Sequence, residues 1–386
     1  ERVLAFDMGG TSTDVARLEG APSYRYEQAI GPVRVVAPAV QIETVAAGGG
    51  SMCVWRNGGL EVGPESAGAD PGPACYGRGG PLTITDVNVL LGCMDPGRAG
   101  IPLDIEAARA RLAGLQAAME ADGAAPVAEG ELLEGLREIA VERMADAIRK
   151  VSLREGYDPA GYALVAFGGA GPQHACAVAE KLGIREILVP GDAGLLSAWG
   201  LHRSGREEIV EHPVLAPLAT LREGWLQLLE ELGETARSGL GDGAVVSRFL
   251  FELRLVGQDS GLEVGVESAL SCDGLLARFV ARYESLYGYS IPEGRKVELV
   301  VIRVVAKEEV RDLPPEEFTG PVCAESREVL QDAFRTCVLE PGWSRAEGSR
   351  GSLRLLREDS QNFPRQGLRR DAAHVSLSLS LGPLSV

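Results

Sequence analysis

The sequence has few aromatic residues and little positive charge. Aromatic residues make up 5% of the 386 residues, and 38 Lys and Arg against 55 Asp and Glu leave a net charge of −17. No run of Lys or Arg occurs, which argues against nucleic acid or an anionic membrane as a partner. Any phosphate that the chain binds must therefore be held mainly by backbone amides, a helix N-terminus and a metal ion.

Cysteine pairs, histidine clusters and long apolar runs are also missing. The 7 Cys occur singly and the 4 His are scattered, which argues against a zinc site or a disulfide framework. Reduced thiols and a cytoplasmic location are expected. No stretch has the length of a membrane span, and no signal peptide precedes Arg2. Because the chain opens in a predicted strand and not at a Met, we expect it to be a piece of a longer protein.

Glycine, in contrast, is abundant, with 49 residues, and the 45% of hydrophobic residues can fill a complete core. This composition is typical of a turn-rich α/β protein of two or three domains. The expected organisation is a first lobe over 1–205 with a loop-rich insertion at 46–100, an α+β domain over 206–312, a small β module over 313–357 and a poorly ordered tail over 358–386.

Apolar periodicity and turn residues predict the elements of the first lobe. Apolar residues recur every three or four positions in an amphipathic helix over 131–154, and a second helical pattern covers 104–121. A strand–turn–helix–strand unit follows, which predicts two parallel strands joined by a helix. Its parts are a strand at 163–167, a glycine turn at 168–171, a helix at 172–182 and a strand at 186–190.

The most informative segment lies near the start of the chain. An apolar strand ends in Asp7, the turn Gly9-Gly10-Thr11-Ser12-Thr13 follows, and a second strand starts at Asp14. Gly9 and Gly10 could take positive φ and present bare N–H groups to phosphate, while the hydroxyls add donors. Asp7 could hold a hydrated divalent cation beside the phosphates. Asp14 could be a second acid for metal or water, or could cap its own turn.

A second glycine corner, Gly168-Gly169-Ala170-Gly171, leads into the helix that begins at Pro172. Without side chains it would let adenine or ribose lie against the backbone, and the helix dipole would point at the same place. Alone, the corner would be interpreted as a tight turn with no ligand; together with the hairpin it favours a nucleotide. His174 could reach the site as a general base or hydrogen-bond donor, or could lie on the helix surface without a catalytic task.

Candidate substrate-binding residues lie in the loop-rich insertion. The segment Gly48-Gly49-Gly50-Ser51 could form an anion nest for a substrate carboxylate. Glu65, Asp70 and Asp86 are acids in or beside these loops; each is expected to brace loop backbone, although one of them could bind substrate or metal. The Pro-Gly-rich setting of Cys75 suggests partial exposure and sensitivity to alkylation, but a buried and inert thiol is the expected outcome.

Three sequence segments together resemble the A-type portion of the hydantoinase/5-oxoprolinase family over about residues 2–306. They are the hairpin 7–14, the loop 62–80 ending in Cys75-Tyr76-Gly77-Arg78-Gly79-Gly80, and Phe167-Gly168-Gly169-Ala170-Gly171-Pro172-Gln173-His174-Ala175. The resemblance implies an actin-like ATPase (ribonuclease H-like) fold for the first lobe. It also implies ATP and Mg²⁺ as cofactors and ring opening of 5-oxoproline or a hydantoin by phosphorylation of the amide oxygen. In this mapping, 7–14 is the second phosphate hairpin and 168–171 the adenosine-side turn.

Two other functions remain open, namely the nucleotide-using subunit of an ATP-dependent ketone carboxylase and a non-catalytic actin-like docking module. The family pattern has two phosphate hairpins, and only one is found here. The expected partners are therefore the missing N-terminal lobe and a B-type subunit or domain, with a homo-oligomer also open. We expect the chain by itself to turn over no measurable substrate. The enzymatic interpretation requires the two glycine corners to converge on one site.

Overall fold

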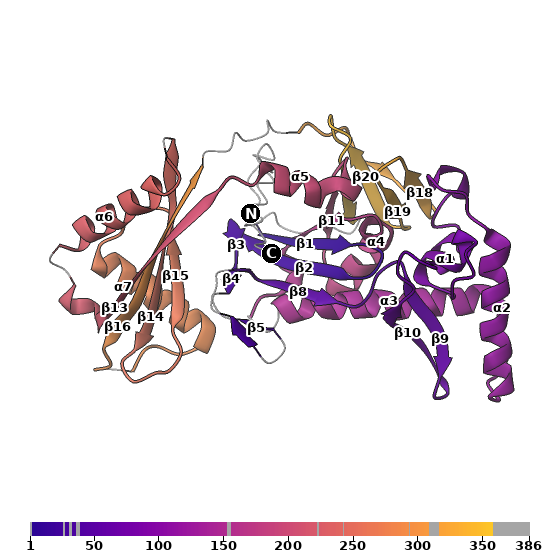
Figure 1. Cartoon of the computed structure of the whole chain (residues 1–386), viewed down its shortest axis with the longest axis horizontal. Helices are drawn as coiled ribbons and strands as arrows, with labels where there is room; N and C mark the ends of the chain where they lie inside the picture. The colour runs from indigo at the N-terminus through magenta and orange to yellow at the C-terminus, as the bar shows by residue number, and fades with distance from the viewer. Residues whose placement is uncertain are drawn as a thin grey trace. The chain divides into compact units, whose positions relative to one another are not determined.

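The computed structural model describes residues 2–25, 28–30, 33–35, 39–152, 156–221, 224–241, 243–292, 294–308 and 316–357. Within them the chain divides into two compact units (Figure 1). The first unit contains residues up to Trp199 together with the segment that follows Pro314, and the second unit begins at Gly200 and ends at Leu313. Each unit has its own hydrophobic core.

A nine-stranded sheet forms the centre of the first unit, in the order β17-β20-β21-β12-β11-β1-β2-β3, with β8 also paired to β2. The strands β1, β11 and β12 are parallel to one another, and the other pairs in this sheet are antiparallel. The bounds are β1 Arg2–Met8, β2 Thr13–Glu19, β3 Ala21–Pro22, β8 Ile42–Val45, β11 Ala163–Phe167, β12 Glu186–Val189, β17 Val322–Cys323, β20 Trp343–Glu347 and β21 Leu353–Arg357.

The predicted strand–turn–helix–strand unit is present as β11, α4 (Gly171–Leu182) and β12. The central strands are buried because their apolar runs face side chains on both sides, as parallel strands in α/β proteins do. The long amphipathic helix is α3 (Glu129–Ser152), which packs against α4, β2 and β8. Two short helical segments, η4 (Pro159–Gly161) and η5 (Ala193–Leu195), and the helix α5 (Leu196–Arg203) complete this part.

The loop-rich insertion is ordered and contains a hairpin and a short helix. Strands β9 (Ser51–Arg56) and β10 (Gly59–Ser66) pair with each other, and α2 (Ile105–Ala121) packs against β9 (Figure 1). The shorter elements between them are η1 Ala74–Tyr76, α1 Ile84–Leu90 and η2 Pro96–Arg98. Four small strands precede the insertion and form two pairs: β4 Tyr24–Arg25 with β7 Ala39–Val40, and β5 Gln28–Ile30 with β6 Val33–Val35.

The second unit has the predicted α+β composition. Its four strands form an antiparallel sheet in the order β13-β16-β14-β15, and its two helices pack on these strands. The bounds are β13 Glu207–Pro217, η6 Leu218–Thr220, α6 Trp225–Ser238, β14 Ala244–Leu255, β15 Leu262–Val266, α7 Cys272–Tyr287 and β16 Val297–Glu308. In neither unit does the described part of the chain contain a helix long and apolar enough to span a membrane.

The segment predicted as a separate β module differs most from its expected organisation. Strands β20 and β21 extend the large sheet beside β12, and the hairpin of β18 (Glu328–Gln331) and β19 (Thr336–Leu339) packs on α4. Trp343 is fully buried, and its indole N–H donates to Glu180 of α4 at 3.0 Å. The segment therefore belongs to the core of the first unit, because its apolar faces are covered by β12 and α4. The predicted tail, 358–386, lies outside the described residues.

Candidate functional site

The parallel pairing of β1 and β11 brings the two glycine corners together. Asp7 lies opposite Phe167 in the register, so the turns that follow the two strands meet at the same edge of the sheet. The amide of Ala170 donates to the carbonyl of Met8 at 3.0 Å. A Cβ atom added at Gly168 would lie 2.4 Å from Asp7 Oδ1. The predicted approach of two corners about 160 residues apart is thus confirmed.

A third glycine segment, 48–50, contacts the hairpin turn that follows β1. The amide of Gly49 donates to the carbonyl of Gly9 at 3.0 Å, and the amide of Gly50 donates to that of Gly10 at 2.6 Å. A Cβ atom at Gly48 would lie 2.6 Å from the backbone nitrogen of Thr11, a distance that no side chain tolerates. Glycine is required at position 48 because two backbones meet there.

These contacts correct the prediction of an anion nest at 48–51. The amides of Gly49 and Gly50 are used by the carbonyls of the phosphate hairpin, and the amide of Gly48 donates to Ser51 Oγ at 2.9 Å. The amide of Ser51 in turn donates to the Gly48 carbonyl at 3.0 Å. With these N–H groups bonded inside the protein, the segment supports the hairpin and is not an open anion nest.

The hairpin turn is built differently from its prediction. Gly9 and Gly10 do not have positive φ, and the Gly9 amide closes the turn by donating to the Ser12 carbonyl at 3.1 Å. Gly168 is the corner glycine with positive φ, at 80°. Thr13 is fully buried, and its hydroxyl donates to the Ala47 carbonyl at 2.6 Å, so that it braces a loop. Gly10 and Thr11 are exposed, so this part of the turn remains open to a ligand.

Asp7 lies beside Gly168, where the corners that follow β1 and β11 meet. Its Oδ2 accepts a hydrogen bond from Ser197 Oγ at 2.7 Å, and Asp14 is its cross-strand neighbour. Burial raises the pKa of the Asp7 carboxyl, the Ser197 hydrogen bond lowers it, and the charge of Asp14 raises it again. Asp14 Oδ1 accepts from Thr44 Oγ1 at 2.5 Å. The two acids are thus close, and each has a hydroxyl partner.

Ser197 was missed by the analysis of the sequence. It follows β12, the third parallel strand, and its helix α5 begins one residue earlier. The loops that follow parallel strands lie at one edge of a sheet. The position of Ser197 after the predicted strand at 186–190 could therefore have indicated that it lies near Asp7.

The residues around Asp7 fit a magnesium ion better than a metal held by protein alone. Among the residues that the structure describes, no group of three or more His, Cys, Asp and Glu could hold a metal. Mg²⁺ is commonly bound by one or two carboxylates together with waters and substrate phosphates. A single partly buried carboxylate beside an open turn satisfies that requirement.

His174 is neither on the helix surface nor accessible to a substrate. It is fully buried, and its Nε2 lies 3.1 Å from Asn88 Nδ2. Burial, and to a smaller extent the charge of Arg137, lowers its pKa from 6.5 to about 3. The side chain is therefore neutral at physiological pH, and direct proton exchange with a bound substrate would need it to leave its buried position.

This burial predicts a loss of stability in acid. The unfolded chain takes up a proton at His174 near pH 6.5 and the folded chain only near pH 3, so the unfolded state binds more protons between these values. We expect this one group to lower the free energy of unfolding by about 1.4 kcal/mol for each pH unit below 6.5. Denaturant unfolding at several pH values would show a shallower slope for H174Q than for the wild type. Equal slopes would contradict the neutral, buried state.

Of the three loop acids, Asp86 braces loop backbone as expected, whereas Glu65 and Asp70 are exposed. Asp86 is fully buried and accepts hydrogen bonds from the amides of Ala74, Cys75 and Thr83, at 3.1, 2.7 and 2.7 Å, and from the Thr83 hydroxyl at 2.9 Å. Glu65 is exposed and pairs with Arg56 at 3.2 Å. Asp70 is exposed.

Replacing Asp86 with Asn should therefore destabilise the first unit. The new NH₂ group would face N–H donors in a buried position, at a cost of about 3 kcal/mol. The matched control is D70N in the same loop, which should change the free energy of unfolding by less than about 0.5 kcal/mol. Denaturant unfolding of both variants tests this, and equal stabilities would show that Asp86 does not brace the loop.

Cys75 has no solvent exposure, so the buried thiol expected over partial exposure is confirmed. Burial and then the nearby carboxylate of Asp86 raise the pKa of its thiol. Cys323, by contrast, is exposed. Brief treatment of the folded protein with iodoacetamide should label Cys323 and leave Cys75 unlabelled, because thiolate and access are both required. Peptide mass mapping would measure the label on each cysteine, and label on Cys75 but not on Cys323 would contradict this prediction.

Known proteins share this architecture. The family model described as hydantoinase/oxoprolinase matches residues 1–205. 5-Oxoprolinase 1 of Arabidopsis thaliana is 35% identical over 78% of this chain, which spans 26% of that relative. Caprolactamase subunit alpha of Pseudomonas jessenii is 31% identical over 84% of this chain and 48% of its own length.

Two solved structures extend the likeness to the fold. The crystal structure of the ATP-dependent caprolactamase from Pseudomonas jessenii has a TM-score of 0.75 at 25% identity, over 92% of this chain and 59% of that one. Nucleotide-free acetone carboxylase has a TM-score of 0.64 at 20% identity, over 92% and 58% of the two chains, which shows the fold alone. The predicted α/β fold class, with its actin-like ATPase lobe, loop-rich insertion and α+β region, is confirmed, while the expected small C-terminal β module is part of the first unit. The chain belongs to the hydantoinase/oxoprolinase family.

Proposed function

We propose that this chain is the nucleotide-binding part of an ATP-dependent hydrolase that opens a cyclic amide such as 5-oxoproline or a hydantoin. The observation that carries the proposal is the contact of the two glycine corners, in which the Ala170 amide donates to the Met8 carbonyl beside Asp7. The family membership and the relatives that act on lactams support the substrate class.

The chemistry explains why such an enzyme would need a phosphate site. A planar amide is a poor electrophile. Transfer of the γ-phosphoryl group of ATP to its oxygen makes the amide carbon susceptible to attack by water. ADP leaves in the first step, and phosphate and the ring nitrogen are released from the carbon afterwards. Phosphoryl transfer depends on positioning and on neutralisation of charge, more than on covalent participation of the protein.

The residues can be assigned to these tasks. The turn Gly9–Ser12 would bind phosphate through its open backbone and hydroxyls, and Gly168–Gly171 with the N-terminus of α4 would lie against the adenosine side. Asp7 would hold a magnesium ion, which when bound neutralises phosphate charge. Asp14, which is next to it, would orient water or a metal-bound water.

The chain spans about a quarter of the plant 5-oxoprolinase and about half of the caprolactamase subunit. The substrate and the complete reaction are therefore proposed for an assembly that includes an N-terminal lobe with the other phosphate hairpin, and a B-type subunit or domain. In this proposal the isolated chain binds nucleotide weakly and does not turn over a lactam, and its oligomeric state is open.

An ATPase assay tests the proposal. Phosphate release would be measured with and without 5-oxoproline or a hydantoin, for this chain and for a protein that also carries the N-terminal lobe and the B-type partner. We expect lactam-dependent release from the complete protein only. Robust release by the short chain would refute its proposed inactivity, and a requirement for bicarbonate and a ketone would favour the carboxylase alternative. If Mg-ATP failed to shift the melting temperature of the complete protein, a docking module would be favoured.

A further inference from the structure

The short helix α1 holds two loops and the start of α4 through its polar side chains. Thr85 Oγ1 donates to the Gly49 carbonyl at 2.9 Å, and Asp86 binds the loop of Ala74 and Cys75. Asn88, on the same helix, binds Gln173 of α4. The first two contacts support the insertion. The third reaches the nucleotide turn, and the function proposed above assigns it no role.

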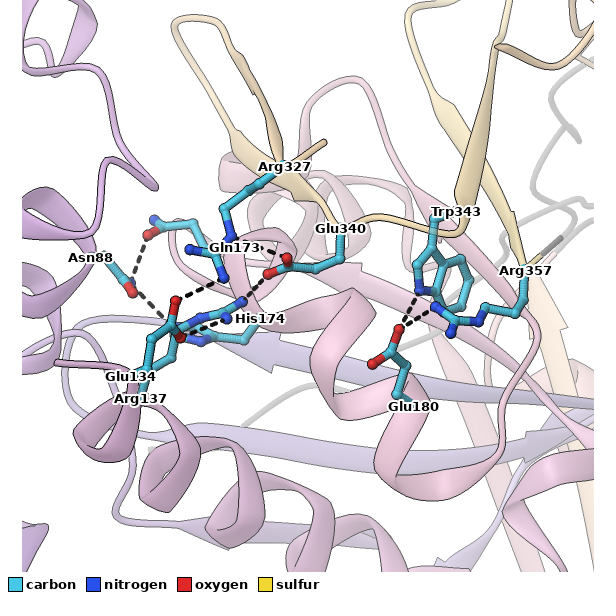
Figure 2. A network of polar contacts seen from close by, with 10 residues as sticks. All are labelled: Asn88, Glu134, Arg137, Gln173, His174, Glu180, Arg327, Glu340, Trp343 and Arg357. Carbon is cyan, nitrogen blue, oxygen red and sulfur yellow. Dashed lines mark hydrogen bonds and ion pairs between the residues drawn. The ribbon is translucent and has the colours of Figure 1, made fainter. Parts of the chain in front are cut away.

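Asn88 connects α1 to the first turn of α4 inside the core. Its Nδ2 donates to Gln173 Oε1 at 2.8 Å and lies 3.1 Å from His174 Nε2 (Figure 2). Asn88, Gln173 and His174 are exposed by 2%, 4% and 0%. Because water does not reach these groups, each hydrogen bond is difficult to replace once it is lost.

Gln173 carries the connection to the glycine turn. With its oxygen held by Asn88, its Nε2 points the other way and donates to the Gly169 carbonyl at 3.4 Å. The Ala170 amide, which belongs to the same peptide unit as the Gly169 carbonyl, donates to the Met8 carbonyl, and the Gly168 amide donates to the Ala193 carbonyl. A Cβ atom at Gly169 would meet nothing within 4 Å, and the peptide unit between Gly169 and Ala170 is held by hydrogen bonds at both ends, from its amide to Met8 and from Gln173 to its carbonyl.

We propose that Asn88 and Gln173 are positioning residues for the nucleotide, which together with the Ala170–Met8 hydrogen bond fix the Gly169 carbonyl and the orientation of the turn 168–171. The proposal rests on the function proposed above, because it names the turn as the nucleotide contact. Neither side chain touches the nucleotide. Their effect is to keep the turn in one conformation, so that binding does not have to order it.

The test removes the hydrogen-bonding groups of Asn88 and Gln173, first separately and then together. N88L and Q173M replace each amide with an apolar side chain of similar size, and the double variant combines them. In the complete protein we expect each variant to bind Mg-ATP about tenfold more weakly by calorimetry. The double variant should bind no more weakly than the weaker single one, because residues that act through one connection are not additive.

Hydrogen–deuterium exchange gives a readout that does not depend on nucleotide. Amides of 168–173 should exchange faster in N88L and Q173M, while those of the hairpin 9–13 keep their wild-type rates. The control is S152A, which removes another buried hydrogen bond, from Ser152 Oγ to the Ile148 carbonyl. It should lower stability without changing either exchange in 168–173 or ATP affinity.

The outcomes separate the two proposals. Faster exchange confined to 168–173 supports the positioning role even if the wild type binds no Mg-ATP, and in that case the proposed function fails by itself. Additive losses in the double variant, or unchanged exchange in 168–173, would overturn the positioning role whether or not ATP binds. A variant that does not fold would be replaced by Q173E, which keeps an acceptor for Asn88 and loses the donor to Gly169.

Discussion

Replacing Asp7 with Asn is expected to lower lactam-dependent ATP hydrolysis by the complete enzyme about 1,000-fold. Asn has the same shape and can still accept the hydrogen bond of Ser197, but it lacks the charge that a magnesium ion requires. Burial already disfavours the charged carboxylate, as the raised pKa of Asp7 indicates. The substitution should therefore leave the free energy of unfolding unchanged or slightly higher, so that activity and stability separate.

The measurement is steady-state phosphate release at several Mg²⁺ concentrations, with thermal unfolding of the same samples. Asp146 on α3 provides the control, since its side chain is 60% exposed and pairs with Arg149. D146N should retain full activity. If D7N were as active as D146N, Asp7 would not hold the metal and the assignment of the phosphate hairpin would be wrong.

Replacing Gly168 with Ala is expected to have the largest effect on the fold of the site. Gly168 has a φ of 80°, which costs a residue with a side chain about 1–2 kcal/mol. A Cβ atom would also lie 2.4 Å from both Asp7 Oδ1 and the Met8 carbonyl oxygen. Because one of these contacts is backbone, the two corners would have to move apart. We expect a loss of about 3 kcal/mol in the free energy of unfolding and loss of nucleotide binding.

The neighbouring glycine is a matched control for this prediction. Gly169 is exposed, its φ is not positive, and a Cβ atom there would meet nothing within 4 Å. G169A should therefore change stability by less than about 0.5 kcal/mol. Denaturant unfolding of both variants, followed by calorimetry with Mg-ATP, makes the comparison. Equal losses for the two variants would show that the close approach at Gly168 does not hold the corners together.

The parts that could be predicted from the sequence are those set by local patterns. The apolar run before Asp7 and the glycines after it predict the hairpin of β1 and β2, and the regular spacing in α3 predicts its buried face. The unit β11–α4–β12 follows from a strand, a glycine turn and a Pro at the start of the helix. The bracing role of Asp86 was also expected from its place beside the loops, although the same expectation for Glu65 and Asp70 is not met, because both are exposed.

The remaining features depend on contacts between distant segments. The amides of Gly49 and Gly50 resembled an anion site until their partners, the carbonyls of Gly9 and Gly10, were known. The burial of His174 depends on neighbours such as Asn88, 86 residues earlier in the chain. The pairing of β21 with β12 likewise joins strands more than 160 residues apart. Local periodicity carries no information about such pairings.

The most direct measurement of the central claim is a structure of the complete protein with Mg²⁺ and a non-hydrolysable ATP analogue. We expect phosphate oxygens within hydrogen-bond distance of the turn Gly9–Ser12, a metal ion on Asp7 and the nucleoside against Gly168–Gly171. A nucleotide bound elsewhere, with both glycine corners free of it, would contradict the account.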